Sequence, residues 1–291
     1  MFIKEGNLKQ AFFWAEEEKR CLLCPHRCIV PEGKISRCGV RKNIGGVLYS
    51  LNYGKVLAAA LDPIEKKPLY RFYPGSKIFS VGTFGCNFDC AFCQNHSLVH
   101  AMQENAALLF PKTSPEQLVS QALQTNSIGI AFTYNEPTVW YEYIADTAPL
   151  AKQAGLKTVL VTNGFIEEVP LTKLLPVIDA MNIDLKAFSQ DYYAKLCKGS
   201  VEPVLRSIRL AAKHCHVEVT CLVIEGKNSE ANQMEQLASE LANISTDIPL
   251  HISAFYPAYK MQDTPPTAPA RILQLCKIAK KQLTFVFPGN I

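Results

Sequence analysis

Clustered cysteines are the residues of this sequence best suited to chemistry. The chain has 11 cysteines in 291 residues, and seven of them fall into two tight groups. The first group is Cys21, Cys24, Cys28 and Cys38, and the second is Cys86, Cys90 and Cys93. Because the chain shows no export signal, we expect it in a reducing compartment, where thiols stay unpaired. Both groups therefore indicate metal ligands rather than disulfide bonds.

The second group has the spacing C-x3-C-x2-C, in a stretch that also contains Gly85, Asn87 and Asp89. Such turn-forming residues make a poor apolar core, which argues against cysteines that serve only for packing. An electron-transfer cluster normally has four cysteine ligands. Three thiolates can instead hold three irons of a [4Fe-4S] cluster and leave the fourth iron open. The spacing therefore predicts a cluster that binds a substrate or cofactor at its open iron.

The first group has the spacing C-x2-C-x3-C-x9-C and supplies four thiolates. Four thiolates suffice for a closed tetrahedral zinc site or for a second Fe-S cluster. The spacing differs from the C-x2-C-x2-C-x3-C-P run of bacterial ferredoxins. A structural zinc is favoured because a small segment has little hydrophobic core of its own. A second cluster and a metal-free group remain alternatives.

Seven β-rich runs alternate with helical patterns in the second part of the chain, which predicts a parallel sheet. The runs span residues 78–83, 128–133, 158–162, 180–185, 217–224, 250–255 and 283–287. Ser114-Pro115 is a typical helix start, and Gly155 a typical helix stop. Six strand-helix units closed by a seventh strand are too few for a complete eightfold barrel. We therefore expect an α/β fold, a partial (β/α)6 TIM-like barrel, over residues 77–291.

Residues 1–76 form a second predicted region, a small Cys-rich appendage. Residues 8–19 have an amphipathic pattern that predicts an opening helix. Residues 46–53 and 55–60 flank Gly54 in the manner of a β-hairpin. Residues 62–68 are polar and predict a connector to the barrel.

The composition argues against several classes of protein. The chain has 30 basic and 26 acidic residues, a net charge of +4 that is too weak and dispersed to indicate nucleic-acid binding. No apolar run approaches the ~18 residues that a membrane-spanning helix needs. The first five residues lack the apolar stretch of a secretion signal. We therefore expect a cytoplasmic protein with neither a membrane nor a nucleic-acid partner.

The second cysteine group resembles the signature of the radical S-adenosylmethionine (SAM) superfamily. That signature is C-x3-C-x-aromatic-C, and Phe92 occupies the aromatic position. The resemblance implies that the amino and carboxylate groups of SAM chelate the open iron. It also implies that one electron from the cluster cleaves the sulfonium and yields a 5′-deoxyadenosyl radical, which abstracts a hydrogen atom from a substrate.

Other segments similar to this superfamily lie at successive predicted strands. They contain Asn135 and Glu136 after the second strand, Thr162 and Asn163 after the third, Asp184 and Lys186 after the fourth, and His251 within the sixth. The resemblance implies that Glu136 meets the amino group of SAM and Lys186 its carboxylate. Hydrogen bonds from Thr162 and Asn163 to sugar or carboxylate are chemically reasonable. His251 is expected to face ribose or substrate.

The sequence departs from the superfamily pattern at two places. Tyr134-Asn135 replaces a glycine pair, and Val161 replaces an aspartate common in glycyl-radical activating enzymes. Residues 21–41 and 62–76 look like the AmmeMemoRadiSam-system radical enzymes, often labelled as similar to pyruvate formate-lyase activating enzyme. This resemblance implies a protein substrate, such as a glycyl-radical enzyme, or a metabolite. It also implies a reductant such as flavodoxin or ferredoxin.

Two other kinds of function stay open at this point. A non-catalytic Fe-S electron carrier or redox sensor needs a fourth ligand for the second cysteine group, and His96 or His100 could supply it. A zinc-stabilised binding module would use both groups structurally, but three thiolates are one short of a closed zinc site. Four isolated cysteines are interpreted as small apolar residues: Cys197, Cys215, Cys221 and Cys276.

Overall fold

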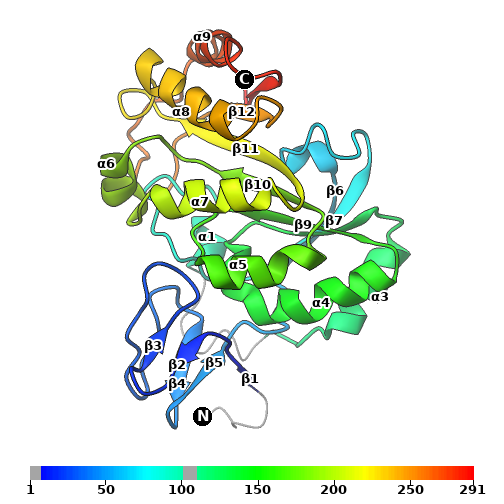
Figure 1. The fold of residues 1–291 in the computed structure, drawn as a ribbon. Coiled ribbons are helices and arrows are strands. Elements are labelled where there is room, and N and C mark those ends of the chain that lie inside the picture. Colours follow the sequence, from blue (N-terminus) through cyan, green and yellow to red (C-terminus); the bar gives the residue numbers. More distant parts are fainter. Residues whose placement is uncertain (1–7, 101–109) are drawn as a thin grey trace.

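A curved eight-stranded sheet organises the chain (Figure 1). The computed structural model describes residues 8–100 and 110–291. The strand order is β13-β12-β11-β10-β9-β8-β7-β6, with every pair parallel except β6 with β7. The strands are β6 (Ala58–Pro63), β7 (Lys77–Gly82), β8 (Gly129–Phe132), β9 (Lys157–Thr162), β10 (Ala180–Asp184), β11 (His216–Val223), β12 (Leu250–Ala254) and β13 (Val286–Gly289). The predicted partial barrel is confirmed, with one antiparallel edge strand added.

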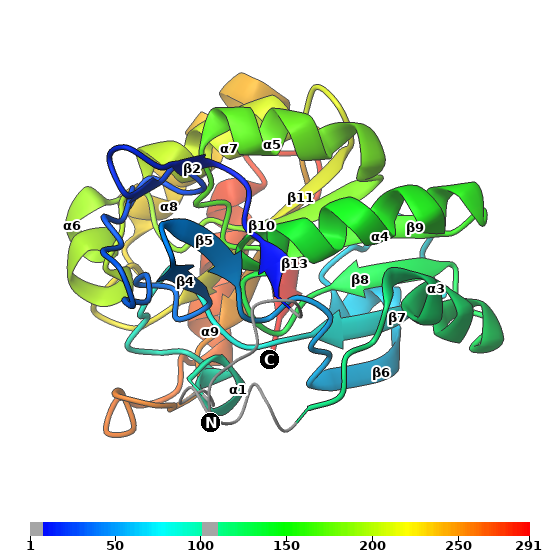
Figure 2. The same ribbon diagram turned by 90° about the horizontal axis from the view of Figure 1, so that it is seen from below.

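The connections between the parallel strands contain the helices. They are α1 (His96–Val99), α3 (Pro115–Gln124), α4 (Tyr141–Gln153), α5 (Glu168–Leu174), α6 (Gln190–Tyr192), α7 (Glu202–Ala211), α8 (Ala231–Ile244) and α9 (Pro269–Ala279), with short turns η2 (Ile64–Lys66), η3 (Pro137–Trp140), η4 (Leu175–Val177) and the π-turn η5 (Tyr193–Cys197). Figures 1 and 2 show α3, α4, α5 and α7 along the outer face of the sheet. Among the described residues, no helix is long and apolar enough to cross a membrane.

Local chemistry explains the helix boundaries that the sequence predicts. Ser114 caps α3: its hydroxyl accepts from the Gln117 N–H at 3.2 Å, and the Gln117 side chain accepts from the Ser114 N–H at 2.8 Å. Pro115 occupies the first turn, where a missing N–H costs nothing. Gly155 follows α4 at a φ of +78°, a backbone conformation that stops a helix and suits glycine.

Two apolar layers hold the barrel together. On the outer face, Leu160 and Met181 pair across β9 and β10 and belong to the large core under the helices. On the inner face, Ala131 and Val159 pair across β8 and β9 and pack with Leu69 of the segment before β7. This alternation puts small side chains inside the barrel and larger ones beneath the helices.

The predicted opening helix at residues 8–19 is wrong. The structure has two short strands there, β1 (Lys9–Gln10) and β2 (Trp14–Ala15), which pair with β5 (Val47–Ser50) and β3 (Arg20–Cys21). Phe13 has a φ of +59°, which no regular helix contains. The apolar pattern instead serves tertiary packing, because the rings of Phe12 and Phe13 meet the ring of Tyr141 edge to face.

The predicted hairpin around Gly54 is also wrong. β5 pairs with β4 (Arg41–Ile44) through the glycine pair Gly45-Gly46, whose φ angles are +61° and +83°. Residues 58–63 form β6 and join the main sheet beside β7. The predicted connector at 62–68 begins inside β6 and continues as η2. The sheet thus starts before residue 77.

A buried ion pair attaches the N-terminal segment, residues 8–57, to the barrel. Arg41 Nη2 lies 2.7 Å from Glu142 Oε1 on α4, and both side chains are almost fully buried. The Phe12 N–H donates to the same carboxylate oxygen at 2.8 Å, and Arg41 donates to the Phe12 carbonyl at 3.0 Å. Buried charges are tolerated when they are paired and hydrogen-bonded in this way.

Glu218 of β11 organises the amino-terminal side of the barrel. Its buried carboxylate accepts from His216 at 2.9 Å and from His251 at 2.7 Å. It also accepts from the backbone N–H groups of Tyr70 and Arg71 at 3.0 and 2.7 Å. Burial favours the neutral acid, but these four donors outweigh it and lower the pKa of Glu218 to about 2.

We predict that Glu218→Gln weakens the fold at neutral pH. A pKa lowered from 4.5 to about 2 contributes about 3 kcal/mol to the free energy of unfolding. This contribution is complete above the unfolded pKa and disappears as the pH falls towards 2. Chemical denaturation from pH 3 to 8 checks it: the variant should be less stable at pH 7 and lose part of the acid dependence. Equal acid dependence in Glu218→Gln and wild type contradicts the prediction; Glu225→Gln is the control.

Candidate functional site

The second cysteine group lies in a loop between β7 and α1, here called the cluster loop (residues 83–95). Asn135 holds the start of this loop: its side chain accepts from the Thr83 N–H and donates to the Gly85 carbonyl, each at 3.1 Å. Gly85 has a φ of +89°, and a Cβ there would lie 2.4 Å from Val40 and 2.8 Å from the Cys38 carbonyl. Only glycine therefore lets the N-terminal segment pack so closely on the cluster loop.

Asn87 and Asn163 connect Cys86 to the end of β9. Asn163 donates to the Asn87 side chain at 2.8 Å, and its amide nitrogen lies 3.7 Å from Cys86 Sγ. Asn87 in turn donates to the Phe165 carbonyl at 2.7 Å. The Phe88 N–H points at Cys86 Sγ at 3.4 Å. These amide and N–H donors can stabilise a thiolate at Cys86.

The carboxylate of Glu136 joins the carboxyl ends of β8 and β9. One carboxylate oxygen accepts from the Thr162 hydroxyl at 2.6 Å and from the Thr138 N–H at 2.9 Å. The other accepts from the Asn163 N–H at 2.7 Å. Burial raises the pKa of Glu136, and the three donors oppose that rise. In this structure Glu136 therefore positions Asn163 through its backbone N–H, and its contact with the amino group of a cofactor stays a prediction.

Asp184 and Lys186 follow β10 beside the other two cysteines. Lys186 Nζ lies 2.6 Å from Asp184 Oδ2, and the two side chains are 15% and 29% exposed. Burial disfavours the charge of Lys186, but Asp184 and the neighbouring Cys90 outweigh burial and raise its pKa. A cation with partial access beside the thiols suits a carboxylate ligand. The sequence placed these two residues in the site, and the structure brings them to Cys90 and Cys93.

Cys197 is a neighbour of the site that the sequence interpretation missed. The Cys197 thiol lies beside Cys90, and the interaction between the two thiols lowers the pKa of Cys90, with a further contribution from Lys186. The carbonyls of Leu196 and Cys197 accept from the N–H groups of Ala91 and Asp89 at 2.9 and 3.1 Å. No spacing rule links residue 197 to the second cysteine group, so only the fold reveals this contact.

Two other predicted contact residues, His251 and Phe92, are buried. His251 binds Glu218 and stacks on Phe287 with ring centroids 5.3 Å apart, near the amino end of β12 rather than at the cysteines. Its place near the start of the strand explains this, because barrel sites form where strands end. Phe92 is 2% exposed and packs on Tyr192, which makes it part of the core beneath the cluster loop.

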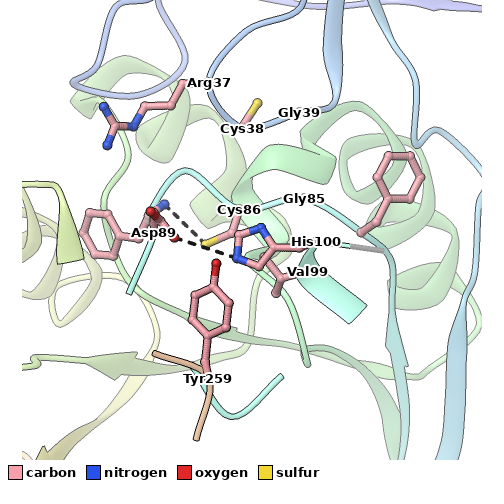
Figure 3. Close-up of a pocket in the computed structure, with 11 residues that line it drawn as sticks. Arg37, Cys38, Gly39, Gly85, Cys86, Asp89, Val99, His100 and Tyr259 are labelled. Carbon is pink, nitrogen blue, oxygen red and sulfur yellow. Dashed lines mark hydrogen bonds and ion pairs between the residues drawn. The ribbon is translucent and has the colours of Figure 1, made fainter. Parts of the chain in front are cut away.

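A cavity of about 490 Å³ opens beside Cys86 (Figure 3). Figure 3 shows Cys86 between Asp89, His100 and Tyr259, with Arg37 and Cys38 of the N-terminal segment on the facing wall. The rings of His96 and His100 stack on Tyr259, at 5.0 and 5.3 Å between centroids. The cavity is large enough for a drug-sized molecule.

The second cysteine group fits a cluster with an open iron. Three thiols come from one loop, next to a cation and to a cavity that can receive a ligand. As the side chains stand, no three Cys, His or carboxylate groups of the described residues form a coordination sphere, at either cysteine group. Without metal, burial raises the pKa of Cys86 and Cys93. A bound metal deprotonates and gathers such thiols.

Comparison with known proteins agrees with this chemistry. The family described as the "Radical SAM superfamily" matches residues 80–239, more than half of the chain, and the chain belongs to this superfamily. It is therefore a radical SAM enzyme, a class that uses a [4Fe-4S] cluster and SAM.

Two sequence relatives and one solved structure are similar to this chain. "Uncharacterized protein MJ0808" of Methanocaldococcus jannaschii is 40% identical over 98% of this chain and 86% of its own length. A "Putative glycyl-radical enzyme activating enzyme MJ1632" of the same organism is 26% identical over 70% of this chain and 77% of its own. A solved structure of "TYW1 with a lysine-pyruvate adduct bound" matches at a TM-score of 0.54, with 17% identity, over 78% of this chain and 84% of that one. This last likeness shows the fold alone.

We predict that Glu136→Gln lowers the thermal stability of the protein and has a smaller effect on its affinity for SAM. In either orientation the amide would point an N–H group at a backbone N–H, that of Thr138 or that of Asn163, and a buried donor without an acceptor costs about 1–3 kcal/mol. The melting temperature should fall by roughly 5 °C. Calorimetry measures both melting and SAM binding. An unchanged melting temperature with a large loss of SAM affinity would instead indicate direct contact. The exposed Glu230→Gln is the matched control.

Proposed function

We propose that this enzyme uses SAM to abstract a hydrogen atom from a protein or small-molecule substrate that enters the cavity beside Cys86. The observation that carries the proposal is the second cysteine group itself, with a cavity of about 490 Å³ beside Cys86 and the ion pair of Lys186 with Asp184 beside Cys90. A [4Fe-4S] cluster held by Cys86, Cys90 and Cys93 supplies one electron, which cleaves the sulfonium of SAM into methionine and a 5′-deoxyadenosyl radical.

The residues around these cysteines have distinct tasks. Lys186 complements the carboxylate of SAM, and its partner Asp184 keeps the ammonium oriented. Asn163 holds the Cys86 segment at the end of β9, and Glu136 holds Asn163. A reactive radical attacks whatever is closest, so the walls of the cavity must exclude water and place the substrate near C5′.

A protein substrate is the more specific version of this proposal. It is supported by the relative MJ1632, whose name describes a putative activating enzyme for glycyl-radical enzymes. A small-molecule substrate is the alternative, because the cavity is also of a size that suits a small molecule. Either version needs a one-electron reductant, such as flavodoxin or ferredoxin. All eleven cysteines are unpaired in the structure.

We also propose that the first cysteine group holds a second metal. Cys21, Cys24, Cys28 and Cys38 come together around one small cavity in the N-terminal segment. Four thiolates suit either zinc or a second Fe-S cluster.

We predict deuterium transfer from the substrate into 5′-deoxyadenosine. The protein is reconstituted with iron and sulfide and incubated anaerobically with SAM, dithionite and either of two labelled fractions. One contains macromolecules from cells grown on deuterated glycine, and the other contains small molecules from cells grown in heavy water. Mass spectrometry of 5′-deoxyadenosine identifies the fraction that donates the label.

The variant Cys86→Ala/Cys90→Ala/Cys93→Ala should form no 5′-deoxyadenosine, whereas Cys276→Ala on α9 should match wild type. Cleavage of SAM without label from either fraction would contradict hydrogen abstraction from these substrates. No cleavage by a protein that has assembled its cluster would contradict the radical mechanism in this chain.

The contact of Cys197 with Cys90 favours a second candidate, a non-catalytic electron carrier or redox sensor. A fourth thiol is available beside the three cysteines, whereas His96 and His100 are stacked on Tyr259. If Cys197 were a ligand, the cluster would have four cysteines and no open iron.

We predict that Cys197 is a hydrogen-bond donor rather than a ligand. A donor to a cluster thiolate stabilises the more negative, reduced cluster. Cys197→Ala should therefore keep its iron and its SAM cleavage but lower the midpoint potential by on the order of tens of millivolts. Redox titration followed by electron paramagnetic resonance measures the shift. Cys197→Ser, which keeps a donor, should lie closer to wild type. Loss of the cluster in Cys197→Ala would indicate that Cys197 is a ligand, and would favour the electron-carrier function.

A further inference from the structure

We propose that the first cysteine group binds a single zinc-class divalent ion, and that this ion fixes the N-terminal segment against the cluster loop. The proposal rests on the second metal site proposed above, but not on cleavage of SAM. It differs from that broader proposal by choosing one ion over a cluster and by assigning the ion a positioning role.

The four cysteines come from two turns that face each other. In the first, the Cys21 N–H donates to the Cys28 carbonyl and the Arg27 N–H to the Cys24 carbonyl, each at 2.9 Å. In the second, the Gly39 N–H donates to the Ser36 carbonyl at 2.9 Å, and the Ser36 hydroxyl lies 3.1 Å from Cys38 Sγ. Both turns are closed by their own backbone hydrogen bonds, so the spacing between the thiols is set by the fold.

The size of the space between these thiols separates an ion from a cluster. All four cysteines line a cavity of only about 10 Å³. That is roughly the room for one water-sized sphere. A single ion needs little more room than this once the thiols gather around it, whereas a cube of four irons and four sulfides needs far more. A cluster would require the two turns to separate.

The electrostatic surroundings suit a tetrathiolate ion. Four thiolates around a divalent ion leave a net charge of −2. Arg41, almost fully buried, lines the same cavity, and its charge interacts with Cys21 and Cys38. Arg37 lies on the wall of this cavity too. A buried cation beside thiolates offsets part of their charge.

The N-terminal segment also needs a stabilising element. Its strands are two to four residues long, and it contains no helix among residues 8–57. Its buried apolar side chains are few, as in small domains that depend on a structural metal. An ion that joins Cys38 to the Cys21–Cys28 turn would close the loop of residues 21–38, in the middle of this segment.

The ion would act on the cluster loop through direct contacts. Cys38 lines both the small cavity and the larger cavity beside Cys86. Its carbonyl lies against Gly85, and the His26 ring nitrogen Nε2 is 2.7 Å from the Asn87 carbonyl. The residues on both sides of Cys86 therefore rest on the segment that the ion would hold. We infer that the ion positions Cys86 without taking part in electron transfer, because zinc has no redox chemistry.

The test uses the full chain with Cys86→Ala/Cys90→Ala/Cys93→Ala, which removes the other metal site. This variant should carry about one zinc per chain by mass spectrometry, and X-ray absorption should show four sulfur neighbours at about 2.3 Å. Adding Cys24→Ala to it should reduce the zinc content to near zero, whereas adding Cys276→Ala should not. If Cys24→Ala prevents folding, cobalt substitution in the three-alanine variant reports tetrathiolate coordination by its visible spectrum.

Two results would overturn the proposal. After anaerobic reconstitution, the three-alanine variant could hold iron and sulfide with the visible absorption of a cluster, which would make the first group an Fe-S site. It could instead hold no stoichiometric metal at all. Both results are read without SAM, so a failure of SAM cleavage in wild type leaves this test unaffected.

Discussion

The rest of the site depends on a buried carboxylate that ties together two strand ends. Glu136 accepts three hydrogen bonds from Thr138, Thr162 and Asn163, and so fixes the carboxyl ends of β8 and β9 relative to each other. Asn163, held in this way, contacts Cys86 and Asn87 of the cluster loop. Because each donor is buried, loss of the carboxylate would leave unpaired polar groups, so the arrangement is retained as a unit.

The cluster loop is held from three sides. The barrel holds its start through Asn135, the turn at Cys197 holds its middle through two backbone hydrogen bonds, and the N-terminal segment presses on Gly85. A loop with so many fixed points has its backbone in place before a cofactor binds, which limits the entropy lost on assembly. The cavity beside Cys86 opens next to this loop.

Charge is separated between the two ends of the barrel. At the carboxyl side, Lys186 and Asp184 stay partly accessible beside the cysteines. At the amino side, Glu218 satisfies two histidines and two backbone N–H groups inside the protein. The first pair can respond to a ligand, whereas the second network serves stability, as is usual for the two faces of such barrels. His251 belongs to the second network, although the resemblance placed it in the first.

The sequence by itself determined the parallel strands, the cysteine signature and the superfamily, since periodicity and spacing are local properties of a chain. It also predicted that Lys186 and Asp184 lie near the second cysteine group. Tertiary structure alone decided which face each strand residue shows, and so it turned Glu136 towards β9 and took His251 to the far end of the barrel. It also decided the fate of residues 8–60, where short-range patterns predict a helix and a hairpin. In that segment, pairing with distant strands and packing on Tyr141 determine the structure. The sequence pattern missed this because contacts between residues far apart in sequence leave no local signal.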